Sequence, residues 1–290
     1  MKILRLIFKK PLSQYHPILY VIATRYRRAV RYWQWKTDGK DYAKSYQQQA
    51  LAFRVKKHQS VLIRKLGDSD QQLQHNKVIN LRLATQHINH ILIQPKQTFS
   101  FCQLVGETTQ AKGYVIGMEL SFGQARAGIG GGICQIANLI HWLVLHSPLE
   151  VVQRSQHSFD PFPDQGRILP FGSGAAIFYN YIDYQFYNPT EYTFQINLWF
   201  SQKCLEGDLR CSIDLGYVYH VFEQNHQFLK IGTDYYRKNE IWRQRKAKYK
   251  SGEILDTECM TKNFAKVLYR PQQIDLEYPD WQTYAEANKI

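Results

Sequence analysis

A segment in the middle of the chain would form a helix that is apolar on nearly every side. This segment constrains the fold more than any other feature. Residues 133–145 read Ile-Cys-Gln-Ile-Ala-Asn-Leu-Ile-His-Trp-Leu-Val-Leu, and Ser147-Pro148 follows as a stop signal. A helix that is hydrophobic all round is buried rather than laid on a surface. The rest of the chain must therefore supply layers that cover this helix on more than one side.

The elements expected before this segment differ from those expected after it. Before it, the pattern predicts a basic helix over 25–66, an amphipathic helix over 73–93 that Pro95 ends, and a short strand over 98–102. After it, alternation of Val, Ile, Tyr and Phe predicts strands over 150–158, 175–187, 192–203 and 208–222. The sequence thus predicts an α+β fold, with N-terminal helices and one buried Cys-bearing helix packed on a mainly antiparallel β-sheet.

The positive charge of the chain is concentrated at its N-terminus. The formal net charge is +13; residues 1–66 hold 16 Lys and Arg against 2 Asp, whereas residues 67–290 hold 21 basic and 22 acidic residues. We therefore divide the chain into a basic, aromatic, largely helical segment (1–66) and an α+β domain (67–290) with a Tyr-rich, basic C-terminal extension. An anionic membrane surface is the partner expected for residues 1–66, and a solvated basic face is the alternative. A nucleic-acid partner is not expected, because no motif that reads bases is present.

No targeting or membrane-spanning segment is recognisable. The longest uncharged apolar run near the N-terminus covers residues 17–23, which is short for the core of a signal peptide, and no Ala-x-Ala cleavage site follows it. We therefore expect a cytoplasmic protein, with an interfacial helix as a means of peripheral attachment to a membrane.

The five cysteines do not form the pattern of a disulfide framework. Cys204 and Cys211 flank Gly207-Asp208, which would make a two-residue hairpin turn and place the two sulfurs opposite one another. In a reducing compartment we expect them to be packed thiols rather than a bridge.

The most specific motif is a run of glycines that leads into the apolar helix. It comprises Gly130, Gly131, Gly132, Ile133, Cys134 and Gln135. Glycines let backbone approach a ligand closely, and the first turn of a helix has N–H groups that could hold an oxyanion. The helix dipole favours a thiolate at Cys134 and should lower the pKa of the thiol. The spacings of nucleotide-binding glycine loops are absent. The alternative is a buried structural cysteine.

A thiol nucleophile needs a base and an orienting group. His157 is the candidate base. On a strand over 150–158, Arg154 and Ser158 lie on the face opposite His157, and both are candidates for binding substrate. Arg154 would bind a carboxylate of the substrate. Asp183 could accept the His157 N–H and fix its tautomer. The alternatives are a structural histidine and a solvated carboxylate. Cys134, His141, His146 and His157 lack the spacing of zinc ligands, so we expect neither a metal nor another cofactor.

These residues resemble the VanW family. The matching pieces are Phe99-Ser100-Phe101, Val105-Gly106, Gly113-Tyr114, Gly130 to Gln135, Gln153-Arg154 with His157-Ser158, and Asp183 with Asn188. The chain is similar to the short, single-domain form, which is named for glycopeptide resistance. In some larger, envelope-facing relatives the domain is regarded as a cysteine-dependent peptidoglycan L,D-transpeptidase. The resemblance implies Cys134 as nucleophile and His157 as base.

Three positions depart from the family pattern. Cys102 stands where the family often has Asn, Ala137-Asn138 where it often has Ser-Thr or Ser-Asn, and Gly174-Ala175 where it often has Asp-Ala. If the missing acid supports the histidine, Asp183 must take its place.

Two functions follow from these observations. The first is cysteine-dependent acyl transfer, transpeptidase- or amidase-like, on cell-wall-type peptides, with a link to glycopeptide resistance. The second is a binding module for a peptidoglycan precursor or another carboxylate-ended peptide, without chemistry at Cys134.

Overall fold

The computed structural model describes residues 16–63, 71–121, 124–156, 159–160, 163, 168–179 and 182–288. The predictions made for residues 1–15, His157 and Ser158 lie outside these residues. The helices are α2 (Pro17–Thr37), α3 (Gln71–Gln86), α4 (Phe101–Val105), η2 (Gln110–Lys112), α5 (Cys134–Leu145) and α6 (Trp281–Asn288). The strands are β1 (Asp41–Tyr42), β2 (Ser45–Tyr46), β3 (Phe53–Val61), β4 (Ile91–Ile93), β5 (Gln97–Ser100), β6 (Ile116–Ser121), β7 (Gln124–Ile129), β8 (Glu150–Gln153), β9 (Phe159–Asp160), β10 (Gln185–Tyr187), β11 (Phe194–Phe200), β12 (Cys204–Cys211), β13 (Tyr217–Ile231), β14 (Asp234–Ala247), β15 (Ile254–Val267) and β16 (Leu276–Tyr278).

Helix α5 begins and ends where its composition predicts, and it lies at the centre of the core. Its buried residues include Ile136, Leu139, Ile140 and Leu143, which pack in one cluster with α3 and with strands from two sheets. Removing this much apolar surface from water is the main stabilising contribution that the helix makes. The predicted α+β class and the buried Cys-bearing helix are confirmed.

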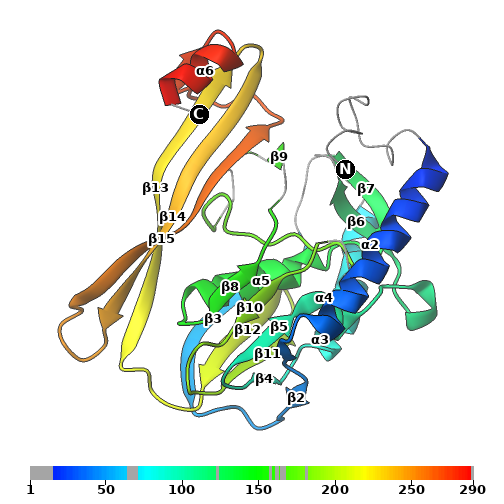
Figure 1. The fold of residues 1–290 in the computed structure, drawn as a ribbon, viewed down its shortest axis with the longest axis vertical. Coiled ribbons are helices and arrows are strands. Elements are labelled where there is room, and N and C mark those ends of the chain that lie inside the picture. The colour runs from blue at the N-terminus through cyan, green and yellow to red at the C-terminus, as the bar shows by residue number, and fades with distance from the viewer. Residues whose placement is uncertain are drawn as a thin grey trace.

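Two sheets surround this cluster (Figure 1). Their strand orders are β1-β5-β10-β8 and β2-β4-β11-β12-β3, and all pairs are antiparallel except β1 with β5. Successive strands β4 and β5 belong to different sheets, and so do β10 and β11. Because β1 and β2 are also in different sheets, the chain passes between the two sheets three times and joins them in one core. We call these two sheets, with α3, α4 and α5, the body.

A third sheet stands beside the body and is much longer (Figure 1). Its order is β16-β13-β14-β15-β9, and β13, β14 and β15 have 15, 14 and 14 residues. We call it the long sheet. The predicted strand over 208–222 is two strands, β12 and β13. The basic run around Arg243 and Arg245, predicted only as a Tyr-rich extension, is part of β14. Among the described helices, none combines the length and the apolar character needed to cross a membrane.

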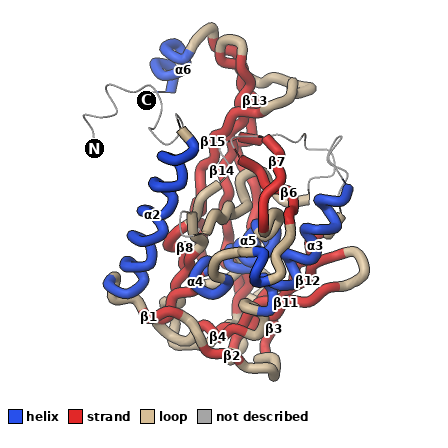
Figure 2. The backbone as a smooth tube through the Cα atoms, turned by 90° about the vertical axis from the view of Figure 1, so that its right-hand side faces the viewer, coloured by secondary structure: helices blue, strands red, loops and turns tan. Residues whose placement is uncertain are grey.

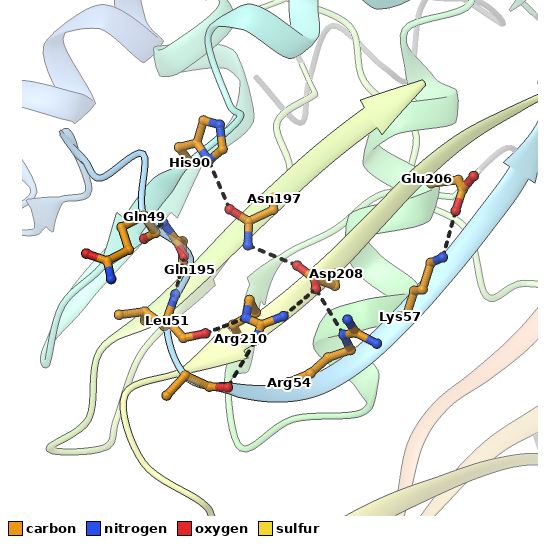
Figure 3. Close-up of polar contacts among 11 residues, drawn as sticks. Gln49, Leu51, Arg54, Lys57, His90, Gln195, Asn197, Glu206, Asp208 and Arg210 are labelled. Carbon is orange, nitrogen blue, oxygen red and sulfur yellow. Dashed lines mark hydrogen bonds and ion pairs between the residues drawn. The ribbon is translucent and has the colours of Figure 1, made fainter. Parts of the chain in front are cut away.

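The predicted basic helix over 25–66 is wrong beyond Thr37. Helix α2 ends at Thr37, and β1, β2 and β3 follow within residues 41–61. Strand β3 pairs with β12, where Arg54 and Lys57 lie 3.1 Å and 2.8 Å from the carboxylates of Asp208 and Glu206. These charges are therefore ladder partners across a sheet rather than the solvated face of a helix (Figure 3).

The predicted hairpin at Gly207-Asp208 is also wrong. Both residues lie in the middle of β12, so Cys204 and Cys211 stand at opposite ends of one strand, and both are free thiols. Gly207 faces α5, where a Cβ would lie 2.8 Å from Leu139 Cδ2. The glycine thus permits close packing of helix on strand and makes no turn.

Asp208 points to the other face of β12, into a polar network (Figure 3). Its carboxylate accepts from Asn197 Nδ2 at 2.9 Å and from Arg210 at 3.0 Å, and Asn197 Oδ1 lies 3.1 Å from His90 Nδ1. The sheet therefore has one apolar face against α5 and one face of paired charges and amides.

Three predicted boundaries differ because pairing between distant segments ends the elements. Helix α3 stops at Gln86, not near Pro95, since Ile91 to Ile93 form β4 and pair with β11. The predicted strand over 150–158 is limited to Glu150–Gln153. The predicted strand over 175–187 is limited to Gln185–Tyr187, with one isolated bridge between Phe178 and Ile182.

Candidate functional site

Cys134 is the first residue of α5, and the glycines before it make a tight passage. Gly130 and Gly132 have φ angles of 77° and 97°, which L side chains rarely adopt. A Cβ on Gly131 would lie 2.4 Å from the carbonyl of Gly117, and a Cβ on Gly117 would lie 2.5 Å from the Gly131 oxygen. Two backbones thus touch at this point, where β6 passes the loop before α5.

A buried asparagine on α3 holds this loop in place. Asn80 donates from Nδ2 to the carbonyls of Gly131 and Val115, both at 3.0 Å, and accepts from the Val115 N–H at 2.9 Å. It is fully buried, and so is its neighbour Leu81. Sequence analysis did not select Asn80, although an amide on the apolar face of an amphipathic helix is a signal that could have found it.

The Cys134 thiol lies against the backbone of a distant residue. The Ile177 N–H donates to Sγ at 3.4 Å, and the thiol donates to the Ile177 carbonyl at 3.5 Å. Burial raises the pKa of the Cys134 thiol, and the nearby Glu119 carboxylate adds to the rise. The predicted lowering of this pKa is therefore wrong, because burial of the thiol disfavours its charged form. Neither Ile177 nor Glu119 was selected from the sequence.

Gln135, a predicted substrate residue, is engaged inside the protein. Its N–H donates to the Gly132 carbonyl at 3.0 Å. Its side-chain amide donates to Ser60 Oγ and to the Val61 carbonyl, both at 2.9 Å. Gln135 thereby ties the start of α5 to β3.

Arg154 is likewise committed to internal bonds. Its guanidinium donates to the carbonyl of Gly174 at 2.9 Å and to Thr261 Oγ1 at 3.1 Å, and it also reaches the Gly172 carbonyl. Burial lowers the pKa of this guanidinium. In the described chain Arg154 therefore clamps the segment 172–174 to β15, instead of presenting a fork to a carboxylate.

The structure places Asp183 among partners other than Cys134. The carboxylate is fully buried and accepts from Ser100 Oγ at 2.6 Å, from the N–H groups of Cys102 and Tyr184 at 2.9 and 2.8 Å, and from Gln185 Nε2 at 2.8 Å. These bonds fasten the β5–α4 junction to the start of β10. Asp183 was predicted to support the candidate base, and its described contacts are those of a structural carboxylate.

His157 lies outside the described residues, but the chain just before it is placed. The Ala176 N–H donates to the Ser155 carbonyl at 2.8 Å. Ala176 precedes Ile177, whose backbone brackets the Cys134 thiol. The segment that leads into His157 therefore runs beside the segment that contacts the candidate nucleophile.

His141 of α5 and His146, which follows the helix as its C-cap, are both buried. His141 Nδ1 lies 3.1 Å from the Tyr184 hydroxyl, and His146 Nδ1 lies 2.8 Å from the Trp142 carbonyl. Burial lowers the pKa of each to about 3, so both are neutral at physiological pH. Within the described part of the chain, no group of three or more His, Cys, Asp or Glu side chains could hold a metal ion.

Comparison with known proteins relates this arrangement to a family. The family described as VanW like protein matches residues 76–210. The Vancomycin B-type resistance protein VanW of Enterococcus faecalis (strain ATCC 700802 / V583) is 29% identical over 270 residues, which cover 93% of this chain and 98% of that protein. The chain is thus similar to the VanW family over residues 76–210 and to this relative over most of its length. The protein YoaR of Bacillus subtilis (strain 168) is 33% identical over 110 residues, or 38% of this chain and 34% of YoaR. No solved structure matches the chain.

One of the departures from the VanW pattern, Gly174, lies against the side chain of Asn138. Asn138 Oδ1 accepts from the Ala175 N–H at 2.7 Å, and a Cβ on Gly174 would lie 2.8 Å from the same oxygen. The Asn138 side chain thus occupies the space that an acidic side chain at position 174 would need. Asn138 thereby holds the segment that leads to Ile177.

Proposed function

We propose that the protein is a cysteine-dependent acyl-transfer enzyme, transpeptidase- or amidase-like, that acts on cell-wall-type peptides and contributes to glycopeptide resistance. The VanW family supports the cellular role, because the relative from Enterococcus faecalis is named as a vancomycin B-type resistance protein. The chemistry is supported by the local geometry around Cys134.

One observation carries the proposal. Cys134 is the first residue of α5, and its thiol contacts the Ile177 backbone, next to the Ala176–Ser155 pair that leads into His157. A nucleophile at a helix N-terminus, preceded by glycines and followed by a base from another segment, is the arrangement that thiol acyl transfer requires.

The raised thiol pKa defines how the step must proceed. Because Cys134 is a neutral thiol in its described surroundings, His157 takes the proton as Sγ attacks the carbonyl carbon. The new S–C bond forms a tetrahedral oxyanion, which the N–H groups of Ile133 and Cys134 at the start of α5 are suited to stabilise. His157 then returns the proton to the amine as the C–N bond breaks. An amine or water attacks the thioester and releases Cys134.

A second function, binding without chemistry, is favoured by a different set of contacts. Arg154, Gln135 and Asp183 all satisfy internal partners, as residues of a rigid scaffold do. In this function the loop at Gly130 to Gly132 binds a carboxylate-ended peptide, and Cys134 is a structural thiol.

The test is the rate of alkylation of Cys134 by iodoacetamide as a function of pH, read by mass spectrometry of the peptide that contains it. In the acyl-transfer enzyme, His157→Ala should slow alkylation at pH 7 by about tenfold or more, because the base is lost. A stem-type peptide should also leave an acyl adduct on Cys134. An alkylation rate that His157→Ala does not change, together with no acyl adduct on Cys134, would instead support the binding module without chemistry.

The chain provides its own controls. Cys211 is a buried thiol whose pKa is also raised by burial, and Cys259 is an exposed thiol on β15. Both are measured in the same digest, and neither should respond to His157→Ala. His220→Ala, which removes an exposed histidine of the long sheet, is the matched variant.

A further inference from the structure

Helix α2 packs on the body through one face only. From that face Arg28 pairs with Glu107 and lies over the Tyr179 ring at 5.3 Å, and Arg31 donates to Gln153 Oε1 at 2.9 Å. Trp35 packs against the main core. Figure 2 shows the helix along the outside of the molecule, with its opposite face turned away from the other elements.

The outward face of α2 is apolar. Ile18, Ile22, Tyr26 and Trp33 are 62%, 57%, 69% and 64% exposed. Their spacings of four, four and seven residues put them on one side of the helix, opposite Arg28 and Arg31. Leu19 and Val30 are exposed beside them, at 40% and 37%. A helix that turns an apolar face outward while Arg28 and Arg31 face the body departs from the usual pattern, and this marks a surface for a partner.

The charge around this face restricts the partner. The helix has five cations, Arg25, Arg27, Arg28, Arg31 and Lys36, and no acidic residue. No Asp or Glu occurs before Asp38, while nine Lys and Arg do. Arg25 and Lys36 are exposed at the border of the apolar face. A second copy of the same face would bring like charges together, whereas anionic lipid headgroups would meet cations all along the border.

We propose that α2 lies in the interface of an anionic phospholipid bilayer, parallel to the membrane plane. Ile18, Ile22, Tyr26 and Trp33 enter the region between headgroups and acyl chains, and Arg25 and Lys36 contact the phosphates. Tyr and Trp favour this depth because their rings are amphipathic. At 21 residues the helix is about 30 Å long, which gives the bilayer contact several turns.

This surface is smaller than the one expected from the sequence. Basic residues of β3, such as Arg54 and Lys57, pair with acids of β12 and belong to the body. Within the described part of residues 1–66, the lipid contact is therefore assigned to α2 alone.

The test is co-sedimentation of the full chain with vesicles of phosphatidylcholine, with and without phosphatidylglycerol. We expect binding only to the anionic vesicles, weakened by salt. Replacing Ile22 and Trp33 together by Ser should lower the partition coefficient by about tenfold or more, and so should R25Q with K36Q. The variant I254S with L255S, which changes exposed apolar residues of β15, should bind as the wild type does.

Folding is checked by thermal unfolding, because the changed side chains point away from the body. An unchanged melting temperature with lost lipid binding supports the proposal. Equal binding by the wild type and the apolar-face variant overturns it. A wild-type chain that does not bind anionic vesicles also overturns the proposal. Analytical ultracentrifugation then shows whether the chain is monomeric or dimerises through α2, and either result leaves the proposal overturned.

Discussion

The body and the long sheet are stabilised in different ways. The body has one continuous apolar cluster that α5, α3 and both sheets share, with side chains such as Ile140 and Phe186 fully buried. The apolar clusters of the long sheet are small, and its largest fully buried side chain is that of Arg237. The match to the VanW family ends at residue 210, before β13 begins. The similarity to the Enterococcus faecalis protein nevertheless covers 93% of the chain and so extends into the long sheet. The long sheet is attached to the body by polar contacts and by a small apolar cluster, in which Trp142 and Leu145 of α5 pack with Val221 and Ile241.

The attachment passes close to the candidate site. Arg243 donates to the Ser147 carbonyl at 2.7 Å, just after α5, and Asn239 donates to the Phe171 carbonyl at 2.8 Å. Arg154 connects β15 to the segment 172–174, which leads to Ile177 at the Cys134 thiol. A change in the long sheet can therefore reach the candidate nucleophile through a chain of hydrogen bonds.

The largest effect should come from a cavity in the body. Ile140→Ala removes a fully buried side chain of α5 and should lower the free energy of unfolding by about 4 kcal/mol. Urea denaturation followed by circular dichroism measures this loss. A loss below about 1 kcal/mol would mean that the cluster of the body is not the main source of stability.

The next effect should be confined to the long sheet. Arg237 pairs with Asp160 at 2.8 Å while both are buried, and its guanidinium lies over the rings of Phe171 and Phe228. Arg237→Met leaves the Asp160 charge without this partner and should cost about 3 kcal/mol. Hydrogen exchange should accelerate in β13 to β15 and remain slow in α5.

A double variant sharpens the same comparison. Arg237→Met with Asp160→Leu removes both charges and should recover most of the lost stability, because neither charge of this pair is left buried without the other. If exchange in α5 accelerates as much as in β14, the two regions unfold as one unit and the contrast between them fails.

Acid should act on the body through its two buried histidines. The pKa values of His141 and His146 are about 3 in the folded protein, below the ordinary value of 6.5. Between these values the unfolded state binds more protons, so stability falls as the pH falls, by about 1.4 kcal/mol per pH unit for each histidine. His141→Gln should flatten the dependence of unfolding free energy on pH between about 4 and 6 by that amount. An unchanged slope would show that His141 is not neutral in the fold.

The smallest effect should come from the exposed ion pairs of the long sheet. Lys266 lies 2.7 Å from the Asp234 carboxylate, with 34% and 43% of the two side chains exposed. Lys266→Ala should leave the melting temperature almost unchanged, because water and salt screen such a pair. Thermal unfolding at low and high salt measures it. A clear fall in the melting temperature would mean that surface charge, as well as buried Arg237, holds the long sheet together.

Local patterns predicted the parts of the fold that depend on composition within one segment. Helix α5 is apolar on all sides, so its extent and its burial could be read directly. Strand β3 could not, because Arg54 and Lys57 are explained only by acids on β12, about 150 residues away. Gly207 resembles a turn signal until Leu139 of α5 is placed against it.

In the candidate site, too, local patterns predicted some features, whereas contacts between distant segments determine the others. The glycine run and Cys134 form one contiguous motif, and the structure places them together at the start of α5. Asn80 and Ile177 reach the motif from other elements, and no sequence spacing connects them to it. The thiol pKa was predicted with the wrong sign because burial depends on segments packed around Cys134, whereas the helix dipole can be inferred from local sequence.

The contact between Gly117 and Gly131 also limits how this protein can evolve. A methyl group at either position would overlap the backbone of the other, at 2.5 Å and 2.4 Å, so no substitution at one position can compensate for a change at the other. Both positions should therefore remain glycine during evolution for as long as β6 passes this loop. In a library of random variants, these two codons should tolerate fewer replacements than the codon of Cys134 itself, since a small residue such as serine fits where the thiol lies.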